Sequence, residues 1–142
     1  MHTTGLVLHP ETRTISIEAP RHAVLHFLGD ANNLPRWAPN FARTVHPKDG
    51  RWLINAGPGE AEILVETSEA EGTVDILAAA DPTRGAFCRV LPNGDGSEFL
   101  FTLFLQRGAS DSAIGQQMSV VEEELRAVRN ICERAFATPD AT

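Results

Sequence analysis

The chain has 142 residues, of which 42% are hydrophobic and 22% are charged, as in an ordinary globular domain. Its 12 basic and 19 acidic residues give a net charge of −7, which argues against nucleic acid as the partner. No apolar run approaches the ~18 residues of a membrane span, so no membrane insertion is expected. The amino terminus lacks the basic start and apolar stretch of a secretion signal, so we expect a cytoplasmic protein.

The length predicts a single domain over residues 1–142, with peripheral tails at about 1–11 and 137–142. Cys88 falls on a predicted strand and Cys132 on a predicted helix. Because disulfides are rare in cytosolic proteins, we expect both cysteines to be reduced core residues, although a disulfide between them remains open.

The first third of the chain predicts one strand and two short helical segments. Residues 12–18 alternate between apolar and polar side chains, which is typical of a half-buried strand. Residues 21–28 predict a short helix with Val24, Phe27 and Leu28 on its inner face. Residues 30–39 contain two prolines, which limit this segment to a helical turn or loop.

Six further strands are predicted between turns rich in glycine and proline. They cover residues 41–46, 51–56, 60–67, 73–79, 85–91 and 97–107. A two-residue turn at Asn93-Gly94 would place Arg89 opposite Glu98 and Cys88 opposite Phe99. A turn centred on Pro82 would place Asp75 opposite Arg89.

These registers divide the last three strands into two faces. We expect the more apolar face to meet a helix. It carries Val74, Ile76, Cys88, Val90, Phe99, Phe101, Leu103 and Leu105. The other face is expected to carry a charge row of Asp75, Arg89 and Glu98, with Leu77, Phe87, Leu100 and Phe104 beside it.

Residues 110–136 predict a long amphipathic helix, with Ser110 or Asp111 as its cap. Its apolar seam consists of Ile114, Met118, Val121, Leu125, Val128, Cys132 and Ala135. Such a helix needs a packing partner, because most helical stability in proteins comes from burial of the apolar face. We expect the predicted sheet to be that partner.

A strand, two short helices, six strands and a long carboxy-terminal helix form an order that resembles the START-related superfamily. Three segments strengthen the likeness: Ile17-Glu18-Ala19-Pro20, Leu34-Pro35-Arg36-Trp37-Ala38-Pro39 and Arg89-Val90-Leu91-Pro92-Asn93-Gly94. Together they look like the polyketide cyclase/dehydrase-like branch, also called the SRPBCC family. The resemblance implies an α+β helix-grip fold, in which a curved antiparallel sheet wraps around the carboxy-terminal helix.

The resemblance also implies a cavity for an apolar or aromatic small molecule between the sheet and this helix. The residues expected to line it are Trp37, Trp52, Phe99, Phe101, Met118, Val121 and Leu125. The alternative is that the same side chains fill a solid core.

Two polar groups are candidates for chemistry in such a cavity. Gln117 and Glu124 lie beside the apolar seam, where Glu124 could anchor a ligand or transfer protons with a pKa raised by burial. Arg89 could hold an oxyanion if the two sheet faces were exchanged. The alternative is that these groups stay solvated, with Arg89 in a surface row of ion pairs.

No metal site or cofactor is expected. His22 and His26 have the spacing of two metal ligands on one helical face, but no third ligand is evident. The phosphate-binding and hydrolase motifs rich in glycine are absent from the sequence.

The sequence therefore favours a protein that binds a small hydrophobic molecule without strong catalysis. The second hypothesis is a polyketide cyclase, aromatase or dehydratase in which Glu124 or Arg89 handles protons or charge. The third is an interaction module, because Leu77, Phe87, Leu100 and Phe104 would form an apolar outer patch. On this basis we expect a homodimer.

Overall fold

A computed structural model describes residues 7–55, 57 and 59–137 of the chain. Its elements are β1 (His9–Ile17), α1 (Arg21–Gly29), a 3-10 turn (Ala31–Asn33), α2 (Leu34–Trp37), β2 (Thr44–Lys48), β3 (Arg51–Asn55), β4 (Glu60–Ser68), β5 (Thr73–Ala78), β6 (Asp81–Asn93), β7 (Gly96–Leu105) and α3 (Asp111–Phe136). This order of a strand, short helices, six strands and a long helix is the predicted one.

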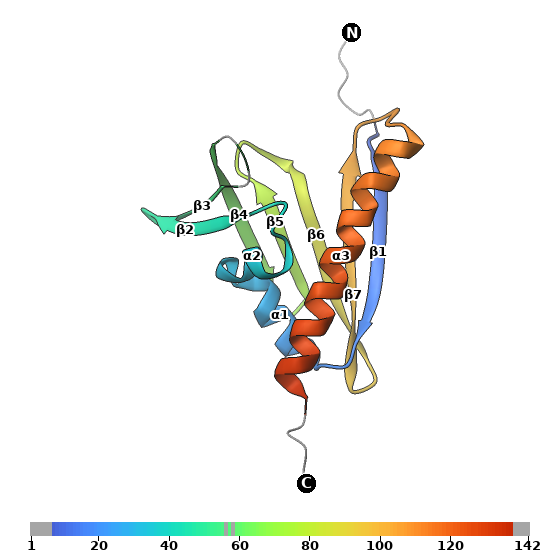
Figure 1. Cartoon of the computed structure of the whole chain (residues 1–142). Coiled ribbons are helices and arrows are strands. Elements are labelled where there is room, and N and C mark those ends of the chain that lie inside the picture. Colours follow the sequence, from blue (N-terminus) through green and yellow to red (C-terminus); the bar gives the residue numbers. More distant parts are fainter. Residues whose placement is uncertain (1–6, 56, 58, 138–142) are drawn as a thin grey trace.

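The strands form one antiparallel sheet of seven strands in the order β1-β7-β6-β5-β4-β3-β2. Figure 1 shows α3 crossing in front of β7 and β1, with α1 and α2 beside it. The two edge strands each contain a proline, Pro10 in β1 and Pro47 in β2. The curved sheet and the helix against it are the α+β arrangement expected from the element order.

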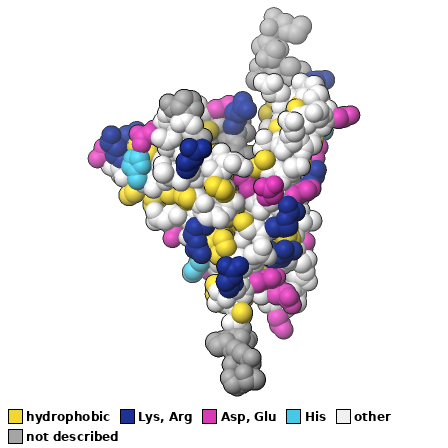
Figure 2. Space-filling model, in the orientation of Figure 1, with side chains coloured by type: hydrophobic (Ala, Val, Ile, Leu, Met, Phe, Trp, Pro, Cys, Tyr) yellow, Lys and Arg dark blue, Asp and Glu magenta, His cyan; other side chains and the backbone are white. Residues whose placement is uncertain are grey.

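The sheet face that was expected to meet the helix is buried. Val74, Ile76, Cys88, Val90, Phe99 and Phe101 are each no more than 4% exposed, and Leu103 packs against their cluster. On α3, the seam residues Met118, Val121, Leu125, Val128 and Cys132 are also buried. At the two ends of the seam, Ile114 is half-buried and Ala135 is exposed. Figure 2 shows charged side chains over the outward surface of α3.

The predicted registers were wrong by two residues. Cys88 pairs with Phe101 rather than Phe99, because the turn is formed by Gly94 and Asp95 and Asn93 pairs with Gly96. Asp75 pairs with Phe87 rather than Arg89, because β6 begins at Asp81 and includes Pro82. A displacement of two residues keeps each side chain on its predicted face.

The predicted charge row does not form. Glu98 instead accepts hydrogen bonds from the hydroxyls of Thr14 and Ser16 on β1, both at 2.6 Å. These bonds hold the pKa of Glu98 below its usual value. Arg89 lies opposite Leu100 with its side chain exposed.

Three further expectations concern the cap of the long helix, the two cysteines and the start of the first strand. Ser110 caps α3 by accepting a hydrogen bond from the amide of Ala113 at 3.1 Å. Cys88 and Cys132 are both free and buried. The first strand begins at His9, three residues before its predicted start; residues 1–6 and 138–142 lie outside the described part of the chain. No helix in the described residues is long and apolar enough to cross a membrane.

Candidate functional site

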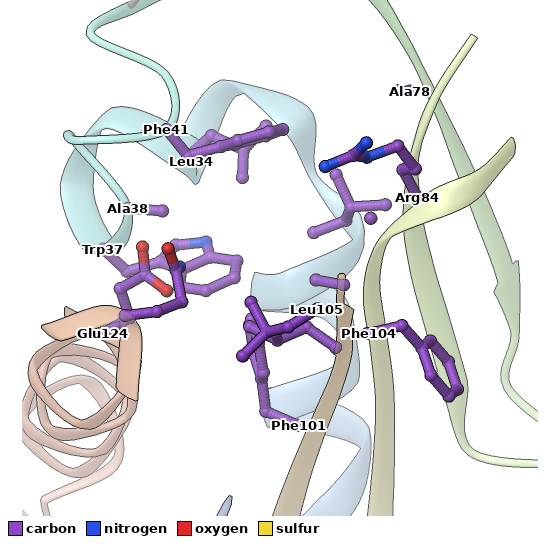
Figure 3. Close-up of a pocket in the computed structure, with 15 residues that line it drawn as sticks. Leu34, Trp37, Ala38, Phe41, Ala78, Arg84, Phe101, Phe104, Leu105 and Glu124 are labelled. Atoms are coloured by element: carbon purple, nitrogen blue, oxygen red, sulfur yellow. The ribbon is translucent and has the colours of Figure 1, made fainter. Parts of the chain in front are cut away.

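A cavity of about 370 Å³ lies between α2, the strands β5 to β7 and α3 (Figure 3). Most of its wall is apolar, since it is lined by Leu34, Trp37, Ala38, Phe41, Ile76, Ala78, Gly85, Ala86, Phe101, Leu103, Phe104 and Leu105. The charged or polar side chains at its border are Arg84, Gln117 and Glu124. A concave apolar surface with a few polar groups is typical of small-molecule sites.

Small residues on β5 and β6 leave room for this cavity. Ala78, Gly85 and Ala86 border it where larger side chains would reach across from the sheet. The β5–β6 register shifts between Leu77 and Ala78, and Gly85 follows the extra residues with a φ of 153°. A Cβ atom on Gly85 would collide with the backbone carbonyl of Ile76. Glycine is therefore required at this irregularity.

Trp37 borders the cavity and carries a buried hydrogen-bond donor. The short helix α2 carries it, and the side chain is only 2% exposed. Its indole Nε1 is fully buried and has no hydrogen-bond partner among the described residues. Leaving a buried donor unpaired typically costs about 1–3 kcal/mol. Such a group is uncommon in native proteins, and beside a cavity it can bind an acceptor on a ligand or a water molecule.

Glu124 contributes a buried carboxyl group to the same wall. It lies on α3 between the buried seam residues Val121 and Val128 and is only 9% exposed. Burial raises the pKa of this carboxyl to about 7, and the nearby charge of Glu123 adds to the effect. Figure 3 shows Glu124 next to Trp37 on one side of the cavity. Near neutral pH this group can therefore both donate and accept a proton.

Arg84 borders the cavity on the opposite side. It precedes Gly85 in β6, and Figure 3 shows its guanidinium group turned back toward Phe41 and Leu34. Within the part of the chain that the structure describes, no ion pair joins Arg84 to a carboxylate.

The structure brings only some of the predicted site residues together. Trp37 and Phe101 border the cavity, as do the predicted polar pair Gln117 and Glu124. The other expected lining residues have a different place. Phe99, Met118, Val121 and Leu125 are buried in the core cluster but do not border the cavity, and Trp52 on β3 is partly buried against this cluster.

Arg89 does not border the cavity either. Its side chain is exposed on the outer face of the sheet, because the two faces were assigned correctly and Arg89 belongs to the outer one. Its conditional role as an oxyanion anchor depended on exchanged faces, so the placement removes the basis for that role.

Sequence reasoning missed several residues of the cavity. Leu34, Ala38 and Phe41 come from the segment after α1, and Arg84 precedes the predicted strand 85–91. A usable signal was the concentration of small residues at Ala78-Ala79-Ala80, which cover the end of β5 and the turn after it, and at Gly85-Ala86 in β6.

The predicted helical histidines lie apart from the cavity. The ring centroids of His22 and His26 are 6.4 Å apart, and His26 Nε2 is 3.5 Å from Glu69 Oε1. Among the described residues, no group of three or more His, Cys, Asp or Glu side chains is placed to hold a metal ion.

No protein family and no curated protein matches this chain by sequence. Solved structures do match. A START superfamily protein from Mycobacterium smegmatis has a TM-score of 0.67 at 12% identity, over 90% of this chain and 99% of that chain. The Zhui aromatase/cyclase from Streptomyces sp. R1128 has a TM-score of 0.67 at 16% identity, over 95% and 99% of the two chains. The Aha1 dimer from Colwellia psychrerythraea has a TM-score of 0.67 at 12% identity, over 90% and 98%.

Proposed function

We propose that this chain, which has the helix-grip fold of the START-related superfamily, binds a small apolar or aromatic molecule that carries a hydrogen-bond acceptor. The observation that carries the proposal is the unpartnered indole N–H of Trp37 at the border of an apolar cavity. A ligand oxygen there would satisfy the donor while the rest of the ligand displaces water from apolar walls.

The size and lining of the cavity support this class of ligand. A volume of about 370 Å³ lies near the lower end of the ~300–1,000 Å³ common for small-molecule sites. Leu34 offers apolar surface from α2, and Phe101 and Leu103 offer it from β7. A compact aromatic ketone has the required shape and a single acceptor.

Glu124 would act with Trp37 on the same ligand oxygen. Below pH about 7 the carboxyl is protonated and can donate a second hydrogen bond to an acceptor. Above that pH the carboxylate carries a negative charge, which disfavours an electron-rich oxygen beside it. The polar end of the ligand is therefore expected to bind more tightly on the acidic side of pH 7.

The test is an NMR titration with 2-acetylnaphthalene, a neutral aromatic ketone, in ¹⁵N-labelled protein. The chain has two tryptophans, so Trp52 on β3 serves as an internal control for Trp37. We expect the Trp37 indole N–H resonance to shift saturably downfield and the Trp52 resonance to stay in place. No saturable shift of Trp37 up to the solubility limit of the ketone would contradict the proposal.

A matched pair of variants locates the binding. Ala86→Leu adds a side chain that occupies the cavity, whereas Ala113→Leu adds the same atoms at an exposed position on α3. With folding checked by circular dichroism, Ala86→Leu should weaken binding by at least about tenfold and Ala113→Leu should leave it unchanged. Equal binding by both variants would show that the ketone binds elsewhere.

A second candidate function is proton-transfer catalysis of the cyclase, aromatase or dehydratase type. It is favoured by the buried carboxyl of Glu124, whose pKa of about 7 suits a general base at neutral pH. Glu124 would remove a proton from the carbon between two carbonyls, and the Trp37 N–H would stabilise the enolate oxygen.

Hydrogen–deuterium exchange at the central carbon of benzoylacetone tests this candidate. The protein should accelerate exchange at pH 7, and Glu124→Gln should lower the rate by about 100-fold. Glu123→Gln changes a neighbouring exposed carboxylate and should keep most of the activity. Exchange no faster than in buffer would contradict the catalytic hypothesis and would not affect the binding proposal.

We also propose a homodimer formed through the outer face of the sheet. Phe104 is among the residues that border the cavity, but Figure 3 shows its ring turned away from it. The side chain is 41% exposed, and its ring centroid lies 5.7 Å from that of Phe87. Leu77, expected in the same patch, is only 6% exposed and adds little surface. The structural similarity of this chain to the Aha1 dimer from Colwellia psychrerythraea supports the proposed homodimer. Light scattering at micromolar concentration should give twice the chain mass; a strictly monomeric mass would contradict it.

We also propose that the protein is located in the cytoplasm. Two free, buried cysteines agree with a reducing compartment. Fractionation of the source cells with an antibody to the chain would test it, and recovery outside the cytoplasm would contradict it.

A further inference from the structure

The cavity has different polar groups at its two sides, and this asymmetry constrains what can bind. Trp37 and Glu124 lie on one side, and the Arg84 guanidinium lies on the other (Figure 3). The first side offers an uncharged donor and a carboxyl group, and the second offers a permanent cation. A ligand that spans the cavity meets both.

The place of Arg84 is fixed by the backbone around it. Asp81 Oδ1 accepts hydrogen bonds from both the amide and the hydroxyl of Thr83, at 3.2 and 2.6 Å. These bonds hold the extra residues of β6 in place on one side of Arg84. On the other side, Gly85 packs its Cα so closely against the carbonyl of Ile76 that no side chain fits there. A β-bulge held at both ends commonly directs a side chain toward a site.

Arg84 is also available for a new partner. Asp81, the nearest carboxylate in sequence, is engaged with Thr83, and the pKa of Asp81 is lowered mainly by those hydrogen bonds, with a smaller contribution from the charge of Arg84. No ion pair to Arg84 occurs among residues 7–55, 57 and 59–137. The chain carries a net charge of −7, and Arg84 places a cation at the border of this apolar cavity.

We propose that the ligand is an organic acid: an apolar or aromatic body with a carboxylate or similar anionic group that pairs with Arg84, and an acceptor oxygen at the far end that meets Trp37. This inference rests on the proposed function and adds the charge and the orientation of the ligand. The reverse orientation would place the anionic group beside Glu124, where two negative charges repel. The planar guanidinium can hold a carboxylate with two parallel hydrogen bonds.

A matched pair of probes tests the charge requirement. 2-Acetylnaphthalene and 6-acetyl-2-naphthoate share the ring system and the acetyl group, and only the second carries a carboxylate at the opposite end. We expect the naphthoate to bind the wild-type protein about five- to tenfold more tightly in low salt, and the advantage to shrink as salt is added. Equal affinities for the two probes would overturn the inference.

Two arginine variants assign the preference to one residue. Arg84→Gln should remove the advantage of the naphthoate and leave the affinity for the neutral ketone unchanged. Arg89→Gln removes the same charge from the exposed outer face and should keep the advantage. A preference that survives Arg84→Gln, or that disappears equally in Arg89→Gln, would overturn the role of Arg84. If neither probe bound the wild-type protein, the proposed function itself would fail, which is a different outcome from equal binding.

Discussion

The two halves of the face between α3 and the sheet are built from similar residues but have different uses. Toward the carboxy-terminal end of α3, Val128 and Cys132 lie in a filled core with Val24 and Leu28 of α1. Toward the other end, the small residues of β5 and β6 leave a cavity of about 370 Å³. Apolar surface stabilises the fold in the filled half, whereas in the open half it remains available to a ligand. Under the proposed function, one sheet face would serve stability and binding at once.

The largest effect is expected from truncation of an aromatic ring, and the loss of stability should differ between the two halves. Phe99 is fully buried in the filled half, so Phe99→Ala should lower the free energy of unfolding by about 3–5 kcal/mol. Phe41 borders the cavity and is 38% exposed, so Phe41→Ala should cost less than about 1 kcal/mol. Urea unfolding of both variants measures the difference. Similar losses would mean that the cavity region is packed as tightly as the core.

Ionisation of Glu124, which borders the cavity in the open half, should lower the stability of the folded protein at high pH. Its pKa is raised from 4.5 to about 7 in the folded state, so the folded protein holds a proton that the unfolded chain has lost. The free energy of unfolding therefore falls as pH rises from about 4.5 to about 7, by about 3 kcal/mol in total. Glu124→Gln should remove this fall and make the protein more stable than wild type at pH 8.

Urea unfolding at pH 5 and pH 8 checks this prediction. The control is Glu123→Gln, which changes the charge of an exposed neighbour and should keep most of the pH dependence, because burial is the larger cause of the raised pKa. If Glu124→Gln fell in stability between the two pH values as steeply as wild type, the carboxyl would be solvated rather than buried.

In the filled half, a buried hydrogen bond made by Ser97 should contribute to stability. Ser97 is 1% exposed, and its hydroxyl donates to the carbonyl of Ala19 at 2.6 Å. Ser97→Ala leaves this carbonyl without its partner and should cost about 1–3 kcal/mol. Thermal or urea unfolding measures the loss, and Ser97→Thr, which keeps the hydroxyl, distinguishes the hydrogen bond from the change in volume.

The smallest expected effect on stability is at Arg84. The side chain is exposed and makes no ion pair with the described carboxylates, so Arg84→Gln should change the free energy of unfolding by less than about 0.5 kcal/mol. The same urea experiment measures it. A larger loss would show that Arg84 supports the fold, and its effect on ligand affinity would then need to be separated from its effect on stability.

The sequence predicted the element order and the buried face of the sheet, because both depend on periodicities that a single chain displays. Val74 and Val90 could be assigned to one face from alternation alone. The registers were less predictable, because Asn93-Gly94 and Gly94-Asp95 are both acceptable turns and differ by two residues in the pairing. That error left the faces intact.

The candidate site was predicted only in part, for a physical reason. Periodicity tells which side chains face inward but does not tell whether the space between them is filled. Met118 and Leu125 were therefore expected at a cavity, whereas both are buried and neither borders the cavity described above. Glu124 was a candidate because a charged residue stood beside the helix seam. Arg84 was missed, because its position depends on an irregularity in β6 that alternation does not encode.

The prolines of the two edge strands limit how copies of this chain can associate. An open sheet exposes backbone amides and carbonyls along its outer strands, and these can pair with a strand from another molecule. Pro10 and Pro47 each remove one amide from such a row, at opposite margins of the sheet. Growth of the sheet from molecule to molecule through paired edge strands is thereby discouraged.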